Sequence, residues 1–257
     1  MSAETIIKSE ARNILKNNFV SAVIAFLIVL LPVFMIDGAT TAISCAILNL
    51  SLDEEISSVL IFSIGYPLEF IAGYLLSPVL NGYIRAFYNA AYTEKIDLKD
   101  VFYYFSSERY RDTLRLNIQY TLRMILPVIL LYLPLMIFDI ICSTTESDFY
   151  GSVLYNNIYF ILAALSTIAA TLYSLRYFTL FTVGIDYPQL TTQQAFEYNK
   201  YIMKYRIHSA TKLIFSFTPW ILLSLLVLPL FYVVPYITQS LCVSAKWMTK
   251  AAIAKES

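Results

Sequence analysis

Long apolar stretches alternate with short polar segments along the whole chain. Several of the apolar stretches approach the length of about 20 residues that a helix needs to cross roughly 30 Å of hydrocarbon. They predict transmembrane helices over residues 19–36, 56–80, 117–141, 155–178, 209–227 and 228–248. The pattern therefore predicts an all-α integral membrane protein with about six transmembrane helices arranged as three hairpins.

The polar segment before the first hairpin has the periodicity of an amphipathic helix. Within residues 3–16, Ile7, Ala11 and Ile14 recur at the spacing of one helical face,. A helix with an apolar face and basic residues on the other lies in the membrane interface, where the basic residues meet anionic lipid headgroups. We expect this segment to be a surface helix, with anionic lipid at the inner face of the bilayer as its partner.

Two further surface helices are predicted from their N-terminal signals. Asp97 is suited to cap a helix over residues 97–106, and Thr191 and Gln194 have the spacing of a capping box,. In the helix that follows, over residues 192–206, the apolar face is expected to point toward lipid. That face comprises Phe196, Met203 and Ile207.

The three surface helices suggest a repeated plan within one transmembrane domain, residues 1–257. Each unit would consist of a surface helix and a helical hairpin, in residues 1–92, 93–188 and 189–257. The last unit is the least certain in topology, because residues 209–248 are short for two crossings. Two spans, a re-entrant pair and one kinked span all remain open there.

The distribution of charge orients these helices. None of the 18 lysines and arginines falls in the predicted outer loops, residues 37–55 and 143–152. Positively charged residues concentrate on the cytoplasmic side of membrane proteins, so both termini are expected in the cytoplasm. Arg123 and Arg176 lie near the inner ends of predicted spans, where a long side chain can reach the headgroups,.

Short sequence features resemble those of a known family. They are Lys8 with Ala11-Arg12 and Leu15-Lys16, Ser77-Pro78 with Gly82, the pair Phe102 and Phe105, Ala195 leading to Met203-Lys204, and Phe217, Trp220, Leu222-Leu223 and Pro235-Tyr236. With these features the chain resembles the bacterial multi-pass membrane family catalogued as domain of unknown function 975. The resemblance covers nearly the whole chain. It implies a polytopic protein of the bacterial cell membrane and no known reaction.

Glu69 is the most unusual residue, because it lies near the middle of a predicted span. An ionised side chain at that depth costs several kcal/mol unless it is paired or hydrated, so intramembrane acids are functional candidates. Glu69 could couple proton or cation movement. In the alternative interpretation it is protonated, or paired with Arg123 or Arg176, inside the helix bundle.

A stripe of small residues in the fourth predicted span indicates close helix packing. Ala163, Thr167, Ala170 and Ser174 lie on one face, and small side chains allow a neighbouring helix to approach,. The neighbour could belong to this chain, to a second copy or to another membrane protein. We therefore predict a helix-packing seam at these positions.

Composition and motifs argue against catalysis. Charged residues make up 14% of the chain, the net charge is zero and there is one histidine. We find no phosphate-binding glycine loop, HExxH or GxSxG motif, and predict no enzyme activity, no cofactor, no metal site and no nucleic-acid partner. A disulfide between Cys45 and Cys142, on the same predicted outer side, remains open.

Two functions are retained. The first is a non-catalytic envelope component with a scaffold, regulatory or protective role. The alternative is a small-solute or ion transporter or channel subunit that uses Glu69, and a membrane enzyme acting on lipid has the least support. A water-filled cavity reaching Glu69 would favour transport, whereas a dry, packed midplane would favour the envelope component.

Overall fold

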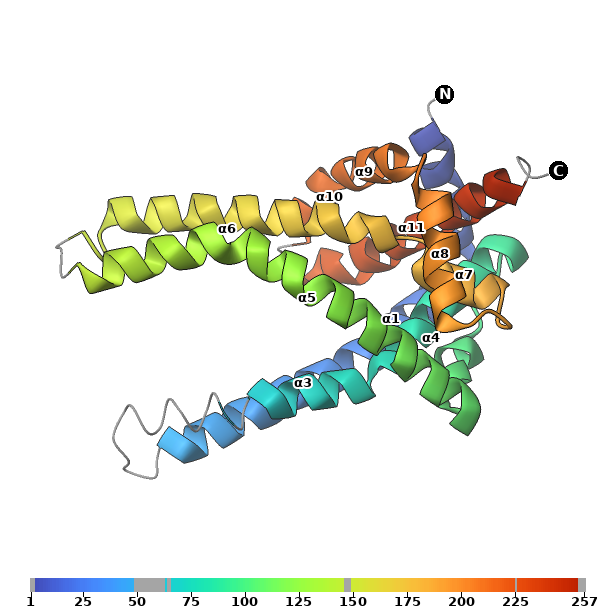
Figure 1. The fold of residues 1–257 in the computed structure, drawn as a ribbon. Helices are drawn as coiled ribbons and strands as arrows, with labels where there is room; N and C mark the ends of the chain where they lie inside the picture. Colours follow the sequence, from blue (N-terminus) through green and yellow to red (C-terminus); the bar gives the residue numbers. More distant parts are fainter. Residues whose placement is uncertain (1–2, 49–62, 64–65, 146–148, 225, 254–257) are drawn as a thin grey trace.

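The computed structural model describes residues 3–48, 63, 66–145, 149–224 and 226–253. Within these ranges the regular secondary structure is helical throughout (Figure 1). The helices are α1 (Ala3–Leu48), α3 (Tyr66–Leu75), α4 (Ser77–Thr93), the 3₁₀ helix η2 (Leu98–Phe105), α5 (Ser107–Thr144), α6 (Val153–Ser174), η3 (Leu175–Tyr177), α7 (Leu180–Asp186), α8 (Thr192–Met203), α9 (Ile207–Phe215), α10 (Thr218–Leu223) and α11 (Val227–Ile253). The predicted all-α class is confirmed for this part of the chain.

Among the described residues, four helical stretches are long and apolar enough to cross a membrane. They are α1, α5 from Arg109, the stretch Val153–Asp186 and α11 from Leu228. The second predicted span is described only from α3 onward, and the fifth is divided into α9 and α10, of 9 and 6 residues. The chain is thus of the membrane-protein type, and its exact number of crossings stays a prediction.

The helices form a base from which two long arms diverge (Figure 1). The base comprises residues 3–18, 77–106, 180–203 and 236–253. Arm 1 comprises residues 29–48 together with α3, and arm 2 comprises residues 125–144 together with α6. Both chain termini lie at the base, and the far ends of α1 and of the α5–α6 pair point away from it.

The first surface helix is not a separate element. α1 runs through it into the first predicted span, with a kink at Asn18 (φ −127°, ψ 22°). The Asn18 side chain holds this kink, because its Nδ2 donates to the carbonyl of Glu94 at 2.8 Å and its Oδ1 accepts from the amide of Ile96 at 3.2 Å. The turn after α4 is thereby attached to the kink.

The apolar face of this segment packs on protein, contrary to the expected lipid-facing orientation. Ala11, Ile14 and Leu15 are buried in a core that also contains Val243 and Ala245 of α11. Lys8 likewise contacts protein, since its Nζ donates to the carbonyl of Ser216 at 2.8 Å at the end of α9. The periodicity predicted the helix correctly but assigned its apolar face to the wrong partner.

The caps of the other two surface helices are confirmed. The side chain of Asp97 accepts from the amide of Lys99 at 2.9 Å at the start of η2, and Thr191 and Gln194 form a complete capping box on α8. The expected lipid contact of Phe196 and Met203 is wrong. Both are buried in a core with α7, including Leu180 and Val183.

The contact between α4 and η2 depends on Gly82. A Cβ atom at this position would lie 1.9 Å from the carbonyl oxygen of Val101, so a larger residue would force the two helices apart. Asp100 of η2 reinforces the contact, since it lies 3.2 Å from Nε of Arg85 and accepts from Nδ2 of Asn89 at 2.6 Å. Close backbone packing and a polar clamp therefore hold η2 on α4.

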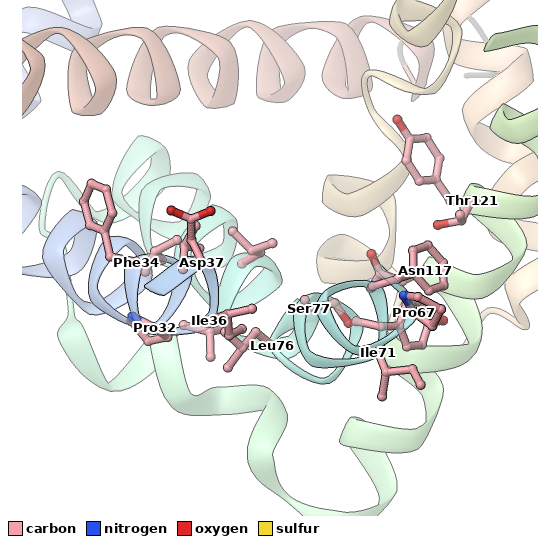
Figure 2. A pocket seen from close by; sticks show the side chains of 18 residues that line it. Pro32, Phe34, Ile36, Asp37, Pro67, Ile71, Leu76, Ser77, Asn117 and Thr121 are labelled. Atoms are coloured by element: carbon pink, nitrogen blue, oxygen red, sulfur yellow. The ribbon is translucent and has the colours of Figure 1, made fainter. Parts of the chain in front are cut away.

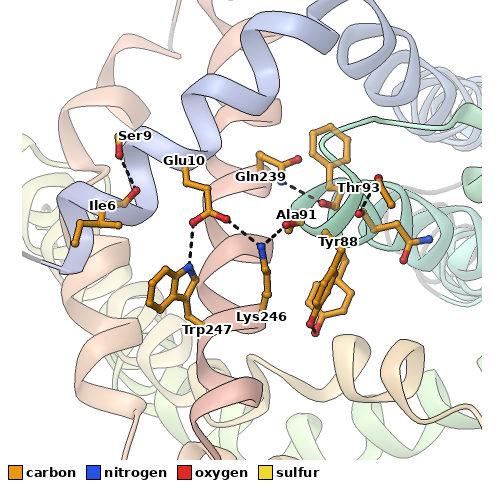
Figure 3. Close-up of polar contacts among 12 residues, drawn as sticks. Ile6, Ser9, Glu10, Tyr88, Ala91, Thr93, Gln239, Lys246 and Trp247 are labelled. Carbon is orange, nitrogen blue, oxygen red and sulfur yellow. Dashed lines mark hydrogen bonds and ion pairs between the residues drawn. The ribbon is translucent and has the colours of Figure 1, made fainter.

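A second polar cluster joins α1, α4 and α11 (Figure 3). Glu10 pairs with Lys246 at 3.1 Å, and its other carboxylate oxygen accepts from the indole of Trp247 at 3.0 Å. Lys246 also donates to the carbonyl of Ala91. These contacts connect residues near both ends of the chain, so α1 and α11 are joined to each other and to α4 within the base.

Candidate functional site

The main candidate site is a cavity of about 1180 Å³ where arm 1 meets α4 and α5 (Figure 2). Its walls are mostly apolar. They include Val29 and Val33 of α1, Phe70 and Ile71 of α3, and Val79 and Leu80 of α4. The volume lies above the range of about 300–1,000 Å³ that is usual for small-molecule pockets, so the cavity is large enough for an extended apolar molecule.

A few polar side chains also line this cavity. Figure 2 shows Asp37 on one side and Asn117 and Thr121 on the other. Ser77 is the first residue of α4, and it is 6% exposed with no hydrogen-bond partner for its hydroxyl among the described residues. An unpaired buried hydroxyl costs about 1–3 kcal/mol, so a ligand that bonds to Ser77 would recover part of this cost.

Glu69 belongs to the helix that supplies one wall of the cavity. α3 contributes Pro67, Phe70, Ile71 and Tyr74 to the lining, and the backbone of Glu69 lies in the same helix. The placement of the Glu69 side chain lies outside what the structure describes. A role for this carboxylate therefore stays a prediction.

The two arginines considered as partners of Glu69 contact aromatic rings. The Arg123 guanidinium lies 3.7 Å from the ring centroid of Phe196 in α8, and that of Arg176 lies 4.8 Å from the centroid of Tyr173. In the described part of the chain the ion pairs are Arg85–Asp100 and Glu10–Lys246. A pairing of Glu69 with either arginine stays a prediction.

The predicted seam in α6 is joined to α5 by a hydrogen bond of Thr167. The hydroxyl of Thr167 lies 2.9 Å from that of Tyr132, which joins the two helices of arm 2. Ala163, Ala170 and Ser174 are half-buried along the same helix. Packing of the seam against a second copy or another membrane protein stays a prediction.

The three cysteines are free thiols, which answers the question of a disulfide between Cys45 and Cys142. Cys45 is exposed, whereas Cys142 and Cys242 are buried. No group of three or more histidine, cysteine, aspartate or glutamate side chains is placed to hold a metal ion among the described residues.

Sequence reasoning missed the cavity and the position of Ser77. Ser77-Pro78 marks the end of a span in the sequence, and the structure places this pair at the junction of α3 and α4, with Pro78 in the first turn of α4. A serine followed by proline inside an apolar stretch was the available signal. It shows where a helix breaks, but not which neighbouring helix leaves space at the break.

A family model described as "Protein of unknown function (DUF975)" matches residues 1–249. No curated protein matches the chain, and no solved structure matches it.

Proposed function

The chain belongs to the DUF975 family, and we propose that it is a non-catalytic component of the bacterial cell membrane that binds the hydrocarbon part of a lipid between its arms. The cavity is the observation that supports this function. Two of its walls, α1 and α5, are helices of membrane-spanning length, and its lining is mostly apolar. A mostly apolar space that opens between the helices is covered more favourably by hydrocarbon than by water, so hydrocarbon from the surrounding bilayer is the natural occupant,.

Such an occupant fits a scaffold or regulatory role better than ion passage. An ion path needs polar groups along its length, whereas the cavity offers polar side chains at a few points only, including Asp37, Ser77 and Asn117. A bound lipid would fill the space between arm 1 and α5 and stabilise one angle between the arms. Lipid binding would in this way be coupled to the arrangement of the helices.

The topology proposed with this function has both termini in the cytoplasm. The location of both termini at the base supports it (Figure 1), as does the absence of lysine and arginine from residues 37–55 and 143–152,. Termini on one side require an even number of crossings. Six crossings result if α9, α10 and α11 form a full hairpin, and four if they form a re-entrant pair.

The exposed Cys45 provides a direct test of this topology. A membrane-impermeant maleimide added to intact cells should label Cys45, and Cys45→Ser should abolish the labelling, because the other two cysteines are buried. In the Cys45→Ser background, Lys250→Cys should react only after the cells are lysed. Labelling of Cys45 only after lysis would overturn the proposed orientation.

Lipid binding in the cavity can be tested by filling the cavity. Ile71→Trp places a large side chain in it, and Ile140→Trp on α5 is a matched control. Ile71 lines the cavity, and the two isoleucines are similarly exposed, at 55% and 56%. A lipid with a photoreactive acyl chain should crosslink several-fold less to Ile71→Trp than to the control. Equal crosslinking of both variants would contradict lipid occupancy.

Transport is the second candidate function, and it is favoured by the presence of Glu69 in the helix that lines the cavity. Protein reconstituted in liposomes would then carry a proton or cation flux that Glu69→Gln reduces at equal protein content. Absence of flux in the wild-type protein, or an unchanged flux in Glu69→Gln, would remove this candidate.

A further inference from the structure

A second pocket, of about 370 Å³, lies in the base. It is lined by α4, η2, the first turns of α5, α7, and the turn that leads into α8 together with the first turn of α8. Three arginines line it, namely Arg85, Arg109 and Arg115, and one carboxylate, that of Asp112. The cations thus outnumber the lining acids, which is typical of a site for an anion.

The arginines differ in their contacts. Arg85 is engaged by Asp100 at 3.2 Å, and its guanidinium lies 3.5 Å from the ring centroid of Tyr103. Arg109 lies 4.0 Å from the same centroid. Neither Arg109 nor Arg115 forms an ion pair with any described residue. The Tyr103 ring therefore positions two guanidinium groups at the pocket, and Arg109 keeps its charge available.

Two buried polar side chains complete the pocket. Asn81 is 7% exposed and Thr113 is 5% exposed, and both line it. Neither side chain forms a hydrogen bond within the described part of the chain, and neither is among its fully enclosed unpaired polar atoms, so both polar ends open toward the pocket. An amide and a hydroxyl that open into a basic pocket and form no hydrogen bond within the described residues are available to bond to a ligand there.

Other neutral donors face the same space. Tyr104 lines the pocket, and burial raises the pKa of its hydroxyl although Arg85 opposes the shift, so the group stays protonated at neutral pH. Thr192 and Ala195 of the first turn of α8 also line it, which places the positive end of that helix dipole at the pocket.

We infer that this pocket binds a phosphate group, with Arg109 and Arg115 providing charge and Asn81 and Thr113 providing hydrogen bonds. Guanidinium groups match phosphate oxygens in paired hydrogen bonds, and the additional neutral donors suit an anion with several oxygens. The phosphate could belong to a phospholipid headgroup or be a soluble ion. This site does not depend on the proposed lipid function, because its residues are distinct from those that line the cavity.

The position of the pocket favours the lipid as the source. Asn81 follows Leu80, which lines the apolar cavity, and Thr113 lies one helical turn before Asn117, which lines it as well. The pocket and the cavity are therefore adjacent along both α4 and α5. One phospholipid could place its phosphate in the pocket and an acyl chain in the cavity.

The test uses the full-length protein in detergent and native mass spectrometry of bound probes. The probes are dioctanoyl phosphatidylglycerol, dioctanoylglycerol, which lacks the phosphate, and inorganic phosphate as a competitor. The variant Arg109→Gln/Arg115→Gln should bind the phospholipid about tenfold more weakly or worse. Arg111→Gln is the matched control, because Arg111 is exposed on the same helix and is not part of the pocket lining.

Thr113→Val separates binding from folding. It removes a hydroxyl that has no partner in the described part of the chain and keeps the side-chain shape, so it should weaken phospholipid binding without lowering the melting temperature. Competition by inorganic phosphate would identify a soluble ion as the source, and its failure would identify the headgroup; both support the phosphate site. Phospholipid binding that is unchanged in both Thr113→Val and the arginine variant would overturn it.

The cavity is tested separately by dioctanoylglycerol. Ile71→Trp should weaken binding of this probe, and the arginine variant should not. If the arginine variant binds the phospholipid as well as wild type does, while Ile71→Trp still weakens dioctanoylglycerol binding, the phosphate site alone is wrong. If Ile71→Trp leaves dioctanoylglycerol binding unchanged, while the arginine variant still weakens phospholipid binding, the proposed lipid function alone is wrong.

Discussion

The base and the arms both contain apolar helices but differ in what covers their side chains. In the most apolar window of α11, which belongs largely to the base, 50% of the residues are buried inside the protein, whereas in that of α5 the share is 11%. The base also contains the ion pairs Glu10–Lys246 and Arg85–Asp100. The arms expose large apolar side chains that a lipid environment or another membrane protein would cover,.

This difference indicates where the stability of the fold is concentrated. Lipid chains are as apolar as leucine, so no hydrophobic force drives helices together inside a bilayer. The arms therefore depend on local packing and on single contacts such as Tyr132 with Thr167. In the base, dense packing and polar contacts between distant segments specify one arrangement, so substitutions there should cost most.

The largest difference is expected between two phenylalanines. Phe87 of the base is fully buried and Phe160 of arm 2 is 74% exposed. Phe87→Ala should lower the free energy of unfolding by about 3–5 kcal/mol, because it leaves a cavity in a packed core. Phe160→Ala should change it by less than about 0.5 kcal/mol. Unfolding in detergent, followed by circular dichroism, measures both, and similar losses would abolish the distinction between base and arms.

The next effect compares two helical glycines. Gly82→Ala should destabilise the protein by about 3 kcal/mol, the upper end of the usual cost of overpacking, because the new Cβ meets the carbonyl oxygen of Val101. Gly73→Ala in arm 1 has nothing within 4 Å of its new Cβ and should be neutral or stabilising. The same unfolding measurement applies, and a tolerated Gly82→Ala would show that η2 does not pack closely on α4.

A smaller loss is expected when the polar cluster of the base is broken. Lys246→Met should cost about 1–3 kcal/mol, because it leaves Glu10 and the carbonyl of Ala91 without their shared donor,. Lys250→Met is the control, since Lys250 is exposed and lies over Tyr92 at 5.2 Å without an ion pair among the described residues. Faster limited proteolysis near the N-terminus should accompany the Lys246→Met change. Equal stability of the two variants would argue against the cluster.

The smallest effect concerns Ser77 at the cavity. Ser77→Ala removes a buried hydroxyl that has no partner among the described residues, so lipid-free protein should keep its stability or gain up to about 1 kcal/mol. Thermal unfolding after thorough delipidation measures this. A clear loss of stability would mean that the hydroxyl already bonds to protein.

Local signals predicted the helices and their caps well. Asp97, Thr191 and Gln194 act as predicted because a cap involves residues only a few positions apart. The break between α3 and α4 at Leu76 also has a local cause, because Pro78 lies in the first turn of α4. The family resemblance was correct as well, since the match covers residues 1–249.

The partners of the apolar faces could not be predicted in the same way. Ala11, Phe196 and Met203 were expected against lipid or at its surface, and all are buried in protein. Lipid and the protein interior both exclude water, so the same helical spacing of apolar residues is compatible with either environment. The basic pocket was missed for a related reason, because Asn81, Arg109 and Thr113 come together only through the packing of α4, η2 and α5.

The sequence by itself determined that this protein is helical and of the membrane type, where several helices begin, and which loops lack basic residues. These properties follow from hydrophobicity, short-range hydrogen bonding and charge, and all of them can be evaluated along the chain. The tertiary structure decided which apolar faces meet protein, where the arms leave a cavity and which polar side chains remain without partners. Those properties depend on contacts between distant segments, and an apolar side chain carries no information about whether lipid or protein will cover it.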